Sequence, residues 1–147
     1  MGSWTQAQRS RLSTERQILN KYFPAFDWIN PTDSNKTYVK GILKTNSGNN
    51  YIIGVYLSSD YPNSQPNMFV LSPLQGYLGK DFSEHGASAS MHTLSPSNGC
   101  VKICHYKGWT PNLTLYKVIL KGRIWLEAFE SHKRTGKTID SFLKHMN

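Results

Sequence analysis

The residues best suited to covalent chemistry are two cysteines near the middle of the chain, Cys100 and Cys104. Lys102, His105 and Lys107 surround Cys104 in the sequence, and nearby positive charge lowers the pKa of a thiol. A thiolate can attack a carbonyl carbon and carry the acyl group as a thioester. Either cysteine is therefore a candidate nucleophile, and the competing interpretation for each is a small buried hydrophobe.

An extended conformation over residues 100–104 would sort these side chains by face. Cys100, Lys102 and Cys104 would point to one side, and Val101 and Ile103 would point to the core. Four extended steps separate the two cysteines by more than ~12 Å, which is too far for a disulfide. We therefore expect two free thiols in a reducing compartment.

His92 and Asn98 could assist such a cysteine. His92 could orient the active-site turn or tune the thiolate, and a purely structural histidine fits the sequence equally well. Asn98 is the one nearby amide that could support an oxyanion. It is followed by Gly99 in an expected turn, which would leave Cys100 exposed.

A zinc site is the alternative use of these side chains. Cys100, Cys104, His105 and His92 are four acceptable zinc ligands. The Cys-x-x-x-Cys-His spacing is not one of the tight knuckle spacings, however, and a chain of 147 residues has a sufficient core without zinc. We expect no metal and no organic cofactor.

The elements that must position these residues alternate helical and extended patterns. Apolar residues at three- and four-residue steps predict an amphipathic helix within 9–28 that ends near Pro24. Two extended runs, Tyr38–Thr45 and Tyr51–Leu57, flank an Asn- and Gly-rich loop and predict a hairpin. A third run, Met68–Leu71, completes a β-meander. The following segment, 72–97, has no period and predicts a long irregular connection.

The C-terminal third is predicted to be helical. Trp109-Thr110-Pro111 precedes a long helix that we expect to be capped by Asn112 and stopped at Gly136. A short helix around 139–143, with Thr138 as its cap, closes the chain. This order predicts a single α+β domain over 1–147, with helices packed on one face of an antiparallel sheet.

Composition limits the function classes. The chain is 38% hydrophobic and 18% charged, which is typical of a globular protein. No apolar run is long enough for a membrane span, and residues 1–11 lack the apolar core of a secretory signal, so we expect a cytoplasmic protein. The net charge is +8, but the basic residues are scattered and no DNA- or RNA-binding motif occurs. This pattern predicts a basic solvated surface that could meet an acidic partner, and a nucleic-acid-binding domain is the less favoured alternative.

Five segments, taken together and in this order, resemble the ubiquitin-conjugating (UBC-fold) family. They are Asp60-Tyr61-Pro62 with Pro66, His92, Asn98-Gly99 before an apolar-Cys step, Trp109-x-Pro111, and Trp125–Glu130 with Thr135-Gly136. The last of these is similar to the helix end of bacterial members found in anti-phage (CBASS) operons. The resemblance extends from the first predicted helix almost to the end of the chain.

The resemblance implies a transferase that carries the C-terminus of a partner protein as a thioester on a catalytic cysteine. The Ile-Cys-His-Tyr step at Cys104 is similar to a Leu-Cys-Leu-Tyr step in bacterial members, so Cys104 is the preferred nucleophile and Cys100 the alternative. By the same resemblance, the carried partner would be a cGAS-like nucleotidyltransferase and the setting antiviral defence.

Two departures from the family pattern support a rival hypothesis. Eukaryotic members have a His-Pro-Asn triplet whose asparagine supports the oxyanion, whereas His92 here is followed by Thr93-Leu94. Counting from Gly99 at the eukaryotic interval reaches Lys102 instead of a cysteine. The rival hypothesis is a catalytically inactive UBC-like binding module.

Overall fold

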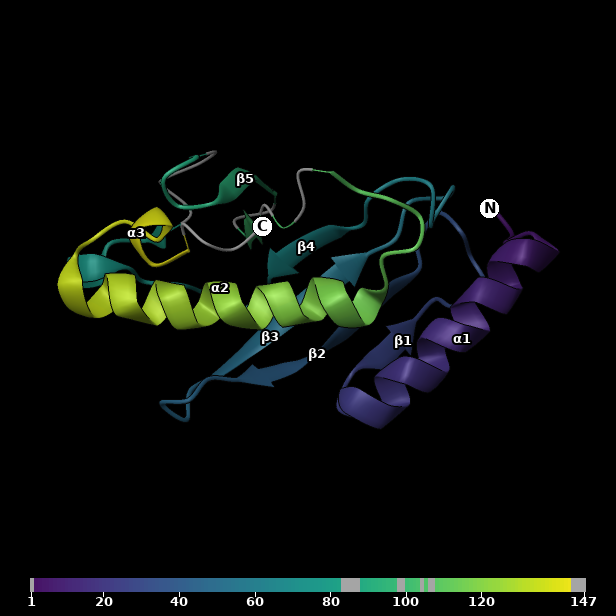
Figure 1. The fold of residues 1–147 in the computed structure, drawn as a ribbon, viewed down its shortest axis with the longest axis horizontal. Coiled ribbons are helices and arrows are strands. Elements are labelled where there is room, and N and C mark those ends of the chain that lie inside the picture. Colours follow the sequence, from purple (N-terminus) through teal and green to yellow (C-terminus); the bar gives the residue numbers. More distant parts are fainter. Residues whose placement is uncertain (1, 83–87, 98–99, 104, 106–107, 144–147) are drawn as a thin grey trace.

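The protein is an α+β structure built on one sheet. The computed structural model describes residues 2–82, 88–97, 100–103, 105 and 108–143. Six strands pair in the order β1-β2-β3-β4-β6-β5, and every neighbouring pair is antiparallel (Figure 1). The elements are α1 (Gln6–Tyr22), β1 (Asp27–Ile29), β2 (Tyr38–Lys44), β3 (Asn50–Tyr56), β4 (Asn67–Val70), η1 (Tyr77–Gly79), β5 (Thr93–Ser97), β6 (Cys100–Ile103), α2 (Leu115–Thr135) and α3 (Asp140–Leu143).

Helix α1 begins before the predicted segment and ends near Pro24, as predicted. It begins at Gln6, because Thr5 and Gln8 form a capping box at its N-terminus. It ends at Tyr22, because Phe23 precedes Pro24 and a residue before proline is disfavoured in the α conformation. The residues beyond this turn are not helical. They form strand β1, which pairs with β2.

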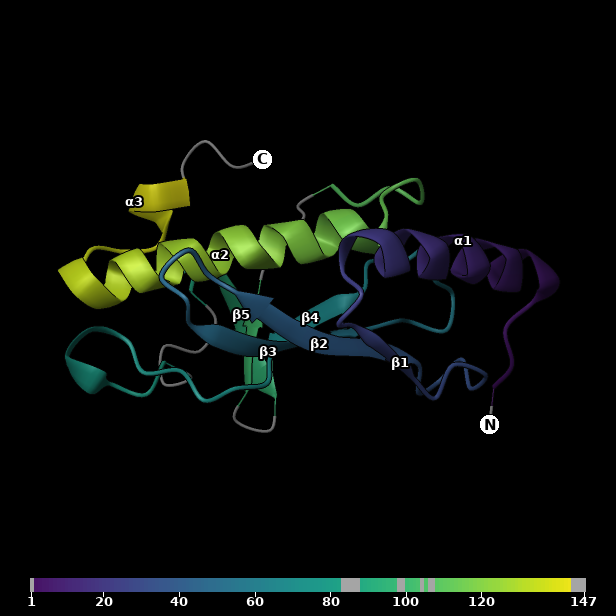
Figure 2. The same ribbon diagram turned by 90° about the horizontal axis from the view of Figure 1, so that it is seen from below.

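The predicted meander of β2, β3 and β4 is confirmed. Inward and outward side chains alternate along these strands, so that Val39, Leu43 and Met68 are buried while Ile42 and Ile52 remain exposed. Helices α1 and α2 lie on the same side of the sheet, which is the side of the buried residues (Figure 2). The predicted packing of helices on one face is therefore confirmed.

The prediction that residues 72–97 form an irregular segment is wrong in part. It contains the short helix η1 and strand β5, which pairs with β6 at the edge of the sheet. Strand β5 has no alternating pattern of its own and contains Pro96, so its extended form depends on pairing with β6.

Helix α2 crosses the sheet and contributes much of the core. Thr114 caps it by accepting a hydrogen bond from the Lys117 N–H, so the predicted cap at Asn112 is wrong. Gly136 ends it in a left-handed conformation with φ 78°, as predicted. Gly122 lets the helix approach β4, because a Cβ there would lie 2.7 Å from the Met68 sulfur.

Among the described residues, no helix is long and apolar enough to cross a membrane.

Candidate active site

Strand β6 presents Cys100 and Lys102 on one face and Val101 and Ile103 on the other. Val101 and Ile103 are buried in the core, and Cys100 and Lys102 are half-buried on the opposite side of the sheet. The strand pairs with β4 on one side and β5 on the other, so it is held along both edges. The predicted sorting of these four side chains is confirmed.

Cys100 lies at the wall of a pocket of about 310 Å³. The pocket is formed by β6 and the segment that follows β4, including Leu71, Pro73 and Asp81. Tyr56 is close to this thiol. Burial raises the pKa of Tyr56, and the neighbouring Tyr38 and Cys100 raise it further. A free thiol is therefore partly accessible beside a concave surface.

Lys102 packs over an aromatic cluster on the same face. Its ammonium group lies 5.8 Å from the centre of the Phe69 ring, which stands edge-on to Tyr56 at 5.6 Å. Phe69 also lies directly opposite Lys102 in the antiparallel pairing of β4 with β6. The ring attracts the cation and keeps this positive charge on the face that presents Cys100.

His105 is buried immediately beyond the strand, at 6% exposure. Its Nε2 lies 3.1 Å from the Gln65 side-chain nitrogen, and its Nδ1 lies 3.3 Å from the Ile103 carbonyl oxygen. A carbonyl oxygen accepts hydrogen bonds, so the contact with Ile103 is a hydrogen bond when Nδ1 carries the proton. Burial lowers the pKa of His105 to about 4, and Lys121 and Lys102 contribute to this shift.

The neutral state of His105 corrects one step of the sequence interpretation. The sequence places His105 among the positive charges expected to activate Cys104. With a pKa of about 4 it is uncharged at neutral pH and contributes no positive charge. Lys102, on the described strand, does carry such a charge.

The segment that follows is attached to the Tyr61-Pro62 turn. The Trp109 indole N–H donates to the Pro62 carbonyl oxygen at 2.8 Å, and the Trp109 ring lies 6.3 Å from the Tyr61 ring. Tyr61 is fully buried, and the Tyr61–Pro62 peptide bond is cis. These contacts give Tyr61, Pro62 and Trp109 an architectural role.

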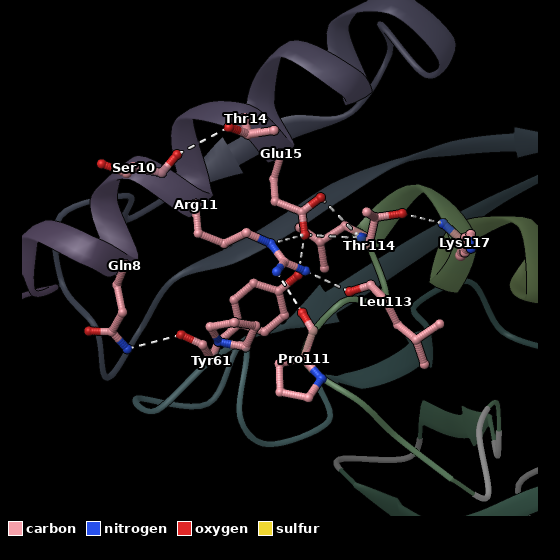
Figure 3. A network of polar contacts seen from close by, with 12 residues as sticks. Gln8, Ser10, Arg11, Thr14, Glu15, Tyr61, Pro111, Leu113, Thr114 and Lys117 are labelled. Atoms are coloured by element: carbon pink, nitrogen blue, oxygen red, sulfur yellow. Dashed lines mark hydrogen bonds and ion pairs between the residues drawn. The ribbon is translucent and has the colours of Figure 1, made fainter.

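A buried carboxylate joins helix α1 to this turn and to helix α2 (Figure 3). Glu15 accepts hydrogen bonds from the Tyr61 hydroxyl and, at 3.2 Å, from the Leu115 N–H at the start of α2. Arg11 lies 3.3 Å from Glu15 and donates to the carbonyl oxygens of Pro111 and Leu113. Burial raises the pKa of Tyr61, and the adjacent carboxylate raises it further, so the phenol stays protonated. This network fixes the start of α2.

His92 is held by helix α3. Its Nε2 lies 2.8 Å from the Asp140 carboxylate, and the Asp140 N–H donates to the Ser90 carbonyl oxygen. The register pairs Thr93 with Ile103 and Ser97 with Cys100, so His92 and Cys100 flank opposite ends of the β5–β6 ladder. The structure brings His92 to Asp140 and does not bring it to Cys100.

Cys104 and Asn98 lie outside the described residues. The residues on either side of Cys104 in the chain, Ile103 and His105, are both buried. Within the described part of the chain, no three His, Cys, Asp or Glu side chains are grouped as metal ligands. The zinc interpretation gains no support from His92 and His105, whose ring nitrogens contact protein groups.

Sequence reasoning missed the two buried glutamates. Glu15 lies between Leu12 and Leu19 at helical spacing. A carboxylate within the apolar stripe of a predicted helix was the signal that could have indicated its burial. Glu130 on α2 accepts hydrogen bonds from Thr45, Asn49 and Tyr51 and ties the β2–β3 hairpin to the helix. Burial acts to raise the pKa of Glu130, but these hydrogen bonds outweigh it and lower that pKa.

Comparison of the chain with protein-family models, with curated proteins and with solved structures found no match.

Proposed function

We propose that the protein is a ubiquitin-conjugating-like transferase with a UBC-like fold, which carries the C-terminus of a partner protein as a thioester. Cys104 is the proposed nucleophile and Cys100 the alternative. His92 and Asn98 remain proposed assisting residues.

One observation carries this proposal: the chain around the two cysteines is anchored on both sides. Strand β6 holds residues 100–103 in the sheet. Beyond Cys104, His105 contacts Gln65, and Trp109 donates to Pro62. Thioester exchange needs a thiol in a defined position, because orienting the reacting groups supplies a large part of the rate enhancement.

The Tyr-Pro and Trp-x-Pro segments on which the family resemblance rests are also in contact with each other. They are 47 residues apart in sequence at Trp109 and Pro62, and the tertiary structure joins them by a 2.8 Å hydrogen bond. Pro111 is joined to α1 through Arg11. Two motifs that resemble the family separately thus form one unit, which supports the UBC-like interpretation of the fold.

The proposed chemistry has two steps. The cysteine thiolate attacks the activated C-terminal carbonyl of the partner, a C–S bond forms, and the activating group departs. An amine then attacks the thioester, a C–N bond forms, the thiolate leaves, and the amine loses a proton. The proposed partner, on the family resemblance alone, is a cGAS-like nucleotidyltransferase.

The test is co-expression with the partner, followed by intact mass measurement and a non-reducing gel with and without added thiol. We expect a thiol-labile adduct in the wild type. Cys104→Ala should abolish it, Cys104→Ser should leave an oxyester that survives thiol, and Cys100→Ala should leave the thioester intact. The reverse result for the two alanine variants would move the nucleophile to Cys100.

The second candidate function is a catalytically inactive UBC-like binding module. Two observations favour it: His105 supplies no positive charge, and His92 contacts Asp140. Absence of an adduct in the wild type, together with retained binding of the partner in a pull-down, would establish the binding module and reject the transferase.

A further inference from the structure

A second pocket lies away from the cysteines, where helix α1 meets strand β1. Its volume is about 480 Å³. Small-molecule sites commonly enclose about 300–1,000 Å³. Its walls come from the residues before α1, from α1, from β1 and from the loop after β1, and they include Trp4, Arg9, Leu12, Arg16, Trp28 and Thr32. Figures 1 and 2 both show α1 beside β1.

The pocket is positively charged. Arg9 and Arg16 line it, and none of its lining residues is acidic. Arg9 uses one N–H to hold the Trp4 carbonyl oxygen at 2.8 Å. Within the described part of the chain, Arg16 has no hydrogen-bond or ion-pair partner, and its guanidinium lies 5.4 Å from the centre of the Trp28 ring. Both side chains therefore keep donors for an anion.

The pocket also has an aromatic residue, Trp28, in its wall. Trp28 is half-buried, and its indole N–H is buried without an acceptor among the described residues. Leu12 and Pro31 extend the apolar part of the lining, and Ser3, Ser13 and Thr32 add hydroxyl groups. A ligand with a planar ring and an anionic group would match this combination.

We propose that this pocket binds a nucleoside phosphate. The guanidinium groups of Arg9 and Arg16 have the planar donor geometry that matches phosphate oxygens. The ring and sugar would lie against Trp28, Leu12 and the hydroxyl groups. The pocket suits a mononucleotide, and the site is independent of either cysteine.

Titration of the full chain with ATP, followed by calorimetry and tryptophan fluorescence, tests this proposal. We expect saturable binding of ATP, with at least tenfold weaker binding of adenosine and of tripolyphosphate. Arg16→Ala should weaken ATP binding at least tenfold. Arg134→Ala, which removes the same charge from the exposed end of α2, is the matched control and should not change it.

Two further variants complete the design. Trp28→Phe should remove most of the fluorescence change, and Cys104→Ala should bind ATP like the wild type, so the result does not depend on the proposed transferase. Circular dichroism checks that each variant is folded. The proposal is overturned if ATP does not bind saturably, if Arg134→Ala weakens binding as much as Arg16→Ala, or if tripolyphosphate binds as tightly as ATP.

Discussion

The chemistry proposed for the thiols depends on the charges of a few neighbouring residues. Lys102 keeps its positive charge on the face of β6 that presents Cys100, with its ammonium over the Phe69 ring. His105 is buried and neutral. Of the three positive charges expected around Cys104, only those of the two lysines are therefore left to lower the pKa of its thiol.

Thiol labelling measures this activation directly. We expect iodoacetamide at neutral pH to modify Cys104 faster than Cys100 and faster than a model thiol, because lysine charge stabilises the thiolate. Lys102→Gln should slow that labelling, and Lys133→Gln, on the exposed end of α2, is the charge-matched control. Equal and slow labelling of both cysteines in the native protein would contradict a catalytic thiol.

Burial of His105 makes the stability of the protein depend on pH. The pKa of His105 is lowered to about 4 in the folded state, below its ordinary value of 6.5. The unfolded chain therefore binds a proton between these values that the folded protein does not bind, so this contribution is complete above pH 6.5 and is lost as the pH falls toward 4. Its size is about 3 kcal/mol in the free energy of unfolding.

Urea denaturation at several pH values tests this dependence. The wild type should lose stability between pH 6.5 and 4 more steeply than His105→Gln, because the variant lacks the titrating group. Taking the difference between the two proteins removes the contribution of the carboxylates. A difference that stays constant across this range would show that His105 is not buried in its neutral form.

At the scale of elements, two buried carboxylates each hold together elements that are distant in sequence, and we call each carboxylate with its hydrogen-bond partners a joint. Glu15 connects α1 with the Tyr61 turn and the first turn of α2, and Glu130 connects α2 with the β2–β3 hairpin. Each carboxylate accepts several hydrogen bonds from elements that are distant in sequence. The position of the Trp109-x-Pro111 segment depends on the Glu15 joint, because Arg11 holds both Glu15 and the Pro111 carbonyl.

Substitution of Glu15 should separate these elements. Glu15→Ala leaves the Leu115 N–H, the Tyr61 hydroxyl and the Arg11 charge without their partner, and should cost about 3–5 kcal/mol in the free energy of unfolding. Glu15→Gln keeps the shape and one acceptor and should cost about 1–2 kcal/mol. The control, Gln17→Ala on the exposed side of α1, should change stability by less than about 0.5 kcal/mol. Equal stabilities of Glu15→Ala and the control would mean that the joint does not hold the elements.

At the scale of the whole molecule, a net charge of +8 favours anionic partners without specifying one. The basic residues are spread over the chain, and the described pocket between α1 and β1 concentrates only two of them. Electrostatic attraction between this net charge and an anionic partner is long-range, and it weakens as dissolved salt screens the charges.

Binding of an oligonucleotide should therefore be weak and independent of sequence. We expect fluorescence anisotropy to detect association with a labelled single strand at low salt and to lose it at physiological ionic strength, because few phosphates are contacted together. Tight binding at physiological salt would show a continuous phosphate-binding surface that the charge distribution does not predict.

The sequence by itself determined the features that depend on neighbouring residues. The β-meander, the alternation of Cys100 and Lys102 against Val101 and Ile103, and the left-handed stop at Gly136 follow from local periodicity and local backbone preferences. Only the tertiary structure decided strands β1 and β5, the neutral state of His105 and the joint at Glu15. These features arise from pairing, burial and hydrogen bonds between residues far apart in the chain, whose energies no local pattern contains.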